Sequence, residues 1–132
     1  MTRPKVRTIT RRMAYMLLIH EPVGQRATRT RAQGEAVYER MVQWGRGLRD
    51  RDLLVSGESL LSPEEGGARV QVRSGRAQVL DGPFAEAKEM VGGFFLLTCR
   101  TRDEALAIAA TCPAAEWATV EVRETGPCFL DA

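Results

Sequence analysis

Two segments of this chain are apolar at every position, although a strand exposed on one side alternates between apolar and polar residues. The first segment, AYMLLI, runs from Ala14 to Ile19, and the second, FFLL, runs from Phe94 to Leu97. Successive side chains of a strand point to opposite faces of a sheet, so both segments predict strands that are buried on both faces. We assign these strands to residues 14–21 and 93–99, and each needs a covering layer on either side.

Two other segments have the spacing of amphipathic helices. The first follows Thr30, which forms a candidate capping box with Gln33. Its apolar stripe recurs at helical intervals and consists of Val37, Met41, Trp44 and Leu48. The second helix begins at the sequence TRDE, residues 101–104, which is also typical of a capping box, and Pro113 follows its end.

The remaining elements complete an α+β domain. We expect a second strand at residues 53–61, a hairpin that turns at Ser74 and Gly75, a short helix within DGPFAEAKEM and a last strand at residues 118–124. The order is β-α-β, then the hairpin and short helix, then β-α-β. This order predicts a ferredoxin-like fold with an inserted hairpin and short helix.

The apolar strands also predict an assembly. Both main helices of such a fold lie on one face of the sheet, because βαβ crossovers have a fixed hand. The other apolar face would then be exposed, which monomeric proteins avoid. We therefore predict a homodimer that packs sheet against sheet, an assembly of the dimeric α/β-barrel type. The domain spans residues 14–124, between a basic flexible tail (1–13) and a C-terminal tail (125–132).

Composition narrows the class of protein. Residues 1–51 hold 12 Lys and Arg against 4 Asp and Glu, whereas the rest of the chain is acidic. No aromatic RNA-binding motif or helix-turn-helix pattern accompanies the basic residues, so we interpret them as a solvated surface and not as a nucleic-acid site. Three cysteines without CxxC spacing and one histidine predict neither a zinc site nor a disulfide framework. We expect a cytoplasmic protein with no membrane span, no metal and no cofactor.

Residues 73–97, RSGRAQVLDGPFAEAKEMVGGFFLL, resemble the signature of the DGPF branch of the YCII-related proteins. Similar family segments correspond to YMLLI at residues 15–19, SGESL at 56–60, DEALAIAATCP at 103–113 and VEVR at 120–123. The resemblance covers about residues 14–124. It implies a ferredoxin-like fold that dimerises through its sheets, in agreement with the argument from the strands.

The resemblance also implies candidate chemistry. Some members of the wider family are lyase-like enzymes that act on small ring compounds, with a His and an Asp proposed as the catalytic pair. The family histidine lies on the first helix, and here that helix has none. If a catalytic site exists, Asp81 is the candidate acid/base or orienting carboxylate, and His20, at the end of the first strand, is the second proton-transfer group. Asp81, Gly82 and Pro83 also have a sufficient structural reading as a turn that starts a helix.

Other candidate residues accompany this pair. The candidate ligand-binding residues are Ser56 and Glu58, on one face of the second strand, together with Gly82, Pro83 and Phe84 of the corner. Two functional hypotheses follow. In the first, the protein binds small molecules or acts on them as a lyase-like enzyme without a cofactor, in a cleft of each protomer of the dimer. The second is a non-enzymatic dimer that acts through a protein partner, because DGPF proteins are often encoded beside extracytoplasmic-function sigma factors.

Overall fold

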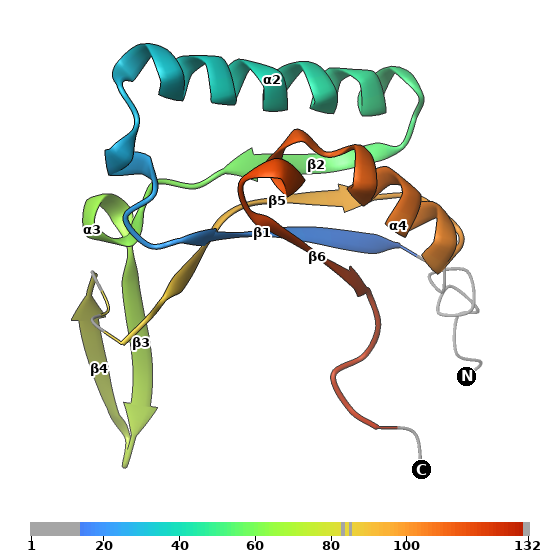
Figure 1. The fold of residues 1–132 in the computed structure, drawn as a ribbon. Coiled ribbons are helices and arrows are strands. Elements are labelled where there is room, and N and C mark those ends of the chain that lie inside the picture. The colour runs from blue at the N-terminus through green and yellow to red at the C-terminus, as the bar shows by residue number, and fades with distance from the viewer. Residues whose placement is uncertain (1–13, 83, 85, 131–132) are drawn as a thin grey trace, which may run out of the picture.

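The computed structural model describes residues 14–82, 84 and 86–130, and the predicted tail at residues 1–13 lies outside them, as does Pro83. A four-stranded antiparallel sheet is the centre of the molecule (Figure 1). Its strands are β1 (Tyr15–Pro22), β2 (Leu54–Ser59), β5 (Glu89–Leu97) and β6 (Thr119–Glu124), in the order β2-β5-β1-β6. This α+β arrangement is compatible with a ferredoxin-like fold.

Both long helices cover the same face of this sheet (Figure 1). They are α2 (Arg31–Asp50) and α4 (Arg102–Thr111), and the short 3₁₀ helices η1 (Arg26–Thr28) and η2 (Pro113–Glu116) lie at their ends. The predicted capping box at Thr30 is confirmed, because its hydroxyl accepts from the Gln33 backbone N–H while the Gln33 side chain accepts from the Thr30 backbone N–H. Among the described residues, no helix combines the length and apolarity that a membrane crossing requires.

The core lies between the helices and the inward face of the sheet. Leu17, Leu97 and Cys99 are its largest fully buried side chains. Trp44 of α2 meets Phe95 of β5 edge to face, with 5.0 Å between the ring centroids. The predicted apolar stripe of α2 therefore does face the sheet, as its spacing indicates.

A second sheet of two strands follows β2. Strands β3 (Ala68–Arg73) and β4 (Arg76–Asp81) form a hairpin, and Ser74 and Gly75 turn it with φ values of 52° and 75°. All twelve strand residues are exposed. The hairpin projects to the side of the main sheet that has no helices (Figure 1).

The short helix of the insertion lies elsewhere than the sequence predicts. The helix is α3 (Pro63–Gly66), which lies before the hairpin and outside every element that the sequence predicts. After the hairpin, none of the described residues in the expected helix is helical, and β5 already begins at Glu89. Pairing of Glu89 and Met90 with the end of β1 draws this stretch into the sheet, which overrides its local helix propensity.

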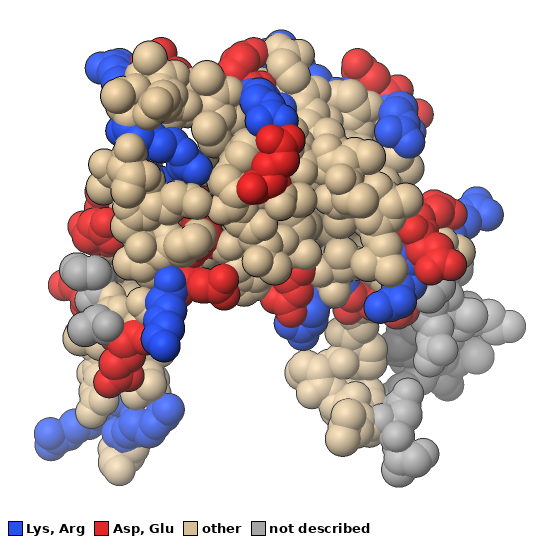
Figure 2. Space-filling model, in the orientation of Figure 1, with Lys and Arg blue, Asp and Glu red and all other residues tan. Residues whose placement is uncertain are grey.

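Among the described residues, no element covers the face of the sheet opposite the helices, which we call the open face (Figure 1). Its centre carries apolar side chains of β1 and β5, which are half-buried in this single chain: Met16, Leu18, Phe94 and Leu96. Polar residues of the two edge strands surround this centre: Ser56, Glu58, Thr119, Glu121 and Arg123. Figure 2 shows the molecule arched below the sheet, between the hairpin on one side and the C-terminal segment on the other.

Candidate functional site

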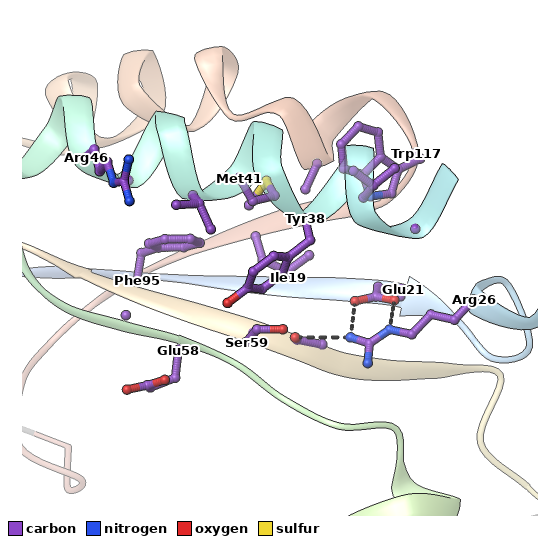
Figure 3. A pocket seen from close by; sticks show the side chains of 18 of the residues that line it. Ile19, Glu21, Arg26, Tyr38, Met41, Arg46, Glu58, Ser59, Phe95 and Trp117 are labelled. Atoms are coloured by element: carbon purple, nitrogen blue, oxygen red, sulfur yellow. Dashed lines mark hydrogen bonds and ion pairs between the residues drawn. The ribbon is translucent and has the colours of Figure 1, made fainter. Parts of the chain in front are cut away.

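A cavity of about 580 Å³ lies between α2 and the sheet (Figure 3). Strands β1, β2 and β5 provide its floor, and Arg26, Arg29 and Trp117 line one end of it. Pockets that bind small organic molecules typically enclose roughly 300–1,000 Å³ and are mainly apolar with a few polar groups. The cavity is therefore large enough for a small ligand.

Two glycines leave part of the cavity floor without side chains. Gly57 of β2 and Gly93 of β5 contribute only backbone to the floor, next to the small Ser59. A Cβ atom on Gly57 would lie 2.8 Å from the Phe95 ring. The sheet thus leaves a hollow under α2 that Phe95 borders but does not fill.

One face of α2 forms the opposite wall. Its lining residues recur every three or four positions, which is the repeat of a single helix face: Gly34, Val37, Tyr38, Met41, Val42, Gly45, Arg46 and Arg49. Figure 3 shows the Tyr38 side chain directed from the helix toward the sheet. The wall is therefore apolar in its middle, with a phenol and two arginines at its margins.

A buried ion pair lies on the floor. The Arg26 Nε and Nη2 atoms donate to the two carboxylate oxygens of Glu21 at 2.9 and 2.8 Å, and further Arg26 hydrogen bonds reach the Leu60 and Gly92 carbonyls. The Glu21 side chain is only 9% exposed, whereas that of Arg26 is 34% exposed. The hydrogen bonds from Arg26 to the Glu21 carboxylate raise the pKa of the guanidinium. The pair ties η1, β1, β5 and the end of β2 together.

The ion pair explains why residue 92, the first of two consecutive glycines in β5, has no side chain. A Cβ atom on Gly92 would collide with the Glu21 carboxylate and lie 2.8 Å from Arg26 Nη2. The register of β1 against β5 shifts at this point, because Ile19 pairs with Gly93 and His20 pairs with Val91. Gly92 therefore occupies an irregularity in the strand, directly beneath the carboxylate.

His20 points away from the cavity. It follows Ile19 and precedes Glu21, and both of these neighbours face the cavity, so its side chain is on the open face of the sheet. There its Nε2 atom lies 2.6 Å from Glu121 Oε1. The hydrogen bond from His20 lowers the pKa of the Glu121 carboxyl group. His20 thus borders a different surface from the cleft between sheet and helices that the sequence suggests.

The DGPF corner lies at the base of the hairpin. Asp81 is exposed and pairs with Ala68 at the end of β4, and a Cβ atom on Gly82 would collide with the Pro63 carbonyl of α3. Phe84 is half-buried, with the Arg69 guanidinium 3.8 Å from its ring centroid. None of the described residues of this corner lines the cavity, and no hydrogen bond among the described residues joins Asp81 to His20.

Strand β2 forms part of the cavity floor, but its two predicted ligand-binding residues have their side chains on the opposite face of the sheet. Ser56 pairs with Leu96 and Glu58 with Phe94, so both belong to the open face. Glu58 also borders the cavity, but Figure 3 shows its carboxylate directed away from α2. Among the described residues, no three His, Cys, Asp or Glu side chains gather as a metal site would require.

Comparison with known proteins decides the family. The profile of the YCII-related domain matches residues 13–127, which is most of the chain. The chain belongs to the YCII-related family. The DGPF motif of residues 81–84 fits this family, and assignment to the DGPF branch itself stays a prediction.

One curated relative shares part of the sequence. An uncharacterized protein of Rhizobium meliloti (strain 1021) is 45% identical over 49 residues, which are 37% of this chain and 40% of that protein. The match thus spans less than half of the relative's length.

Most residues that line the cavity of this YCII-related chain differ from the site residues that the sequence predicts, with Glu58 the exception. Glu21, Arg26, Tyr38 and Trp117 have no motif around them, and only the alternation along β1 could have placed Glu21 on the same face as Ile19. The excess of arginine in residues 1–51 was a further signal, which we interpreted as a solvated surface. Four of these arginines, Arg26, Arg29, Arg46 and Arg49, border the cavity, and two of them, Arg46 and Arg49, are exposed to solvent as well.

Proposed function

We propose that this YCII-related protein binds a small organic molecule in the cavity between α2 and the sheet. The observation that carries the proposal is a cavity of about 580 Å³ whose floor is bare backbone at Gly57 and Gly93 and whose helical wall is apolar in its middle. The buried Glu21–Arg26 pair holds the elements around the hollow in place without occupying it.

The test is to fill the cavity. Val42 is half-buried and lines the wall, so Val42→Trp places a large ring inside it, whereas Gln43→Trp adds the same ring at an exposed neighbouring position. A panel of small neutral, acidic and basic ring compounds is screened by thermal shift and isothermal titration. We expect at least one compound to bind the parent and Gln43→Trp but not Val42→Trp. Binding by none of the panel, or equal binding to both variants, would refute the proposal.

A lyase-like acid/base reaction is a second candidate function. The observation that favours it is the His20–Glu121 contact, because a carboxylate that orients an imidazole is a common arrangement for proton transfer. On this proposal His20→Gln and Glu121→Gln lose turnover of a small ring compound, whereas Asp81→Asn reports whether the hairpin corner contributes. Loss of activity only in Asp81→Asn would exclude the His20–Glu121 pair.

We further propose that the open face of the sheet is the interface of a homodimer. Its apolar centre and polar rim are the usual anatomy of a protein interface, and the chain has no further layer there among its described residues. Leu18→Glu places a carboxylate between Phe94 and Glu121 and should convert a dimer to monomer in sedimentation equilibrium, whereas Leu106→Glu on α4 should not.

A monomeric parent protein would refute the homodimer. That result would leave the open face to a different protein, such as an extracytoplasmic-function sigma factor. Retention of that partner on immobilised protein, and its loss when residues 1–13 are removed, would then support the accessory role.

A further inference from the structure

We propose that the cavity selects organic acids, with the apolar body of the molecule under α2 and its carboxylate at Arg46 and Arg49. This inference rests on the proposed function of the cavity and adds the chemical class of its ligand. It follows from which charges face the cavity and which of them already have a partner.

Six charged residues line the cavity, and three of them do not contribute a charge to its interior. Glu21 and Arg26 neutralise each other through two hydrogen bonds. Glu58 directs its carboxylate away from α2, as Figure 3 shows. The remaining three are Arg29, Arg46 and Arg49, so the accessible charge of the cavity is positive.

The three arginines differ in what they already contact. Arg29 is half-buried and its guanidinium lies 5.8 Å from the centre of the Trp117 ring, within reach of a cation–π interaction. Arg46 and Arg49 are exposed at the margin of the cavity, and no ion pair involving either is found among the described residues. They are three positions apart on α2, so their side chains emerge on one helix face and can approach one anion together.

The helix end does not cancel this preference. Arg49 belongs to the last turn of α2, where the aligned peptide dipoles amount to roughly half a negative charge. Two guanidinium groups carry two full positive charges and also donate hydrogen bonds to a carboxylate, often in bidentate geometry. The arginines therefore outweigh the dipole, and the margin attracts an anion.

The rest of the cavity suits an apolar body. Met41 lines the middle of the cavity and Phe95 lines one end, where Figure 3 also shows Arg46. An arginine beside an aromatic ring can hold a carboxylate while the ring packs against the adjoining apolar part of the ligand. An aromatic or alicyclic acid of one or two rings fits this arrangement, whereas a purely polar anion leaves the apolar wall uncovered.

The experiment compares three probes of nearly equal size. Naphthoate, naphthamide and naphthylmethylammonium present the same rings with a negative, neutral or positive substituent. Isothermal titration at low salt should show naphthoate binding about tenfold or more tighter than naphthamide, since hydrogen bonds to charged groups are the stronger ones. Because the two arginines are exposed, the preference should weaken as salt is raised.

Two matched double variants test whether Arg46 and Arg49 cause the preference for naphthoate. Arg46→Gln/Arg49→Gln removes two charges at the cavity, and Arg73→Gln/Arg76→Gln removes two charges from the exposed hairpin. We expect the cavity variant to bind naphthoate and naphthamide equally, while the hairpin variant keeps the parent preference. Arg46→Lys/Arg49→Lys should restore part of it.

The outcomes separate the inference from the function on which it rests. Equal binding of naphthoate and naphthamide by the parent, both abolished by Val42→Trp, would overturn the acid preference and leave a small-molecule cavity. A preference that the hairpin variant loses as much as the cavity variant would also overturn it, because the effect would then be one of net charge. Absence of binding by all three probes and by the wider panel of ring compounds would overturn both proposals.

Discussion

The ion pair between Glu21 and Arg26 is the most sensitive point on the floor of the cavity, and its two members should respond unequally to mutation. Arg26→Met removes the guanidinium but keeps an unbranched apolar side chain. Glu21→Gln keeps the size of the side chain and removes only its charge. Each variant isolates one partner, and the double variant measures the interaction between them.

The expected magnitudes follow from burial. Arg26→Met leaves a carboxylate that is 9% exposed without its two charged donors, and breaking a buried pair in this way costs about 3–5 kcal/mol. Arg26 itself is 34% exposed, so we expect the lower value, about 3 kcal/mol of unfolding free energy. Glu21→Gln leaves an arginine that keeps water and two carbonyl acceptors, at Leu60 and Gly92, so we expect about 1–2 kcal/mol.

Urea unfolding followed by circular dichroism gives these values, at one protein concentration because association contributes to apparent stability. The double variant should lose at least about 1 kcal/mol less than the sum of the single losses, as expected for residues in direct contact. A larger loss for Glu21→Gln than for Arg26→Met would refute the reasoning from burial. Additive losses would show that the two side chains are not coupled in solution.

Three further measurements test other parts of the structure. Gly92→Ala should lower the unfolding free energy by about 1–3 kcal/mol through overpacking, whereas Gly47→Ala, which has open space at its Cβ position in α2, should leave it unchanged or raise it by up to about 1 kcal/mol; urea unfolding of both variants checks this. The hydrogen bond from His20 lowers the folded-state pKa of Glu121, so its stabilising effect is present above the ordinary pKa of a glutamate and is lost as the pH falls through the lowered value; the melting temperature of Glu121→Gln should therefore fall less on acidification than that of the parent. Native alkylation with iodoacetamide should modify the exposed Cys128 well before the two buried cysteines, whose pKa values burial raises, and peptide mass spectrometry that found equal labelling would contradict the described packing.

Local patterns in the sequence predict most of the elements. The strand predicted at residues 14–21 corresponds to β1 at Tyr15–Pro22, and the capping residues Thr30 and Thr101 immediately precede α2 and α4. These signals are local, because strand alternation and helix capping act within a few residues. The prediction of a helix within DGPFAEAKEM was wrong for the opposite reason, because the last residues of this stretch pair with a strand that is distant in the sequence.

The candidate site was less predictable because it depends on which face of each strand meets the helices. Alternation alone separates Ile19 and Glu21 from His20, but it does not say which set faces α2. The bare part of the cavity floor is formed by Gly57 and Gly93, which lie in strands far apart in the sequence and come together only through the pairing of β2 with β5. A motif search finds conspicuous residues such as Asp81, whereas a cavity is defined by side chains that are missing.

The bare glycines of the cavity floor have a consequence for how such proteins diverge. Gly57 and Gly93 contribute only main chain there, and α2 contributes more lining side chains than any other element. Substitutions along that helix can change which ligand is bound while the sheet and its strand pairing stay the same. Proteins that descend from one ancestral fold can in this way acquire different ligand specificities with little loss of stability.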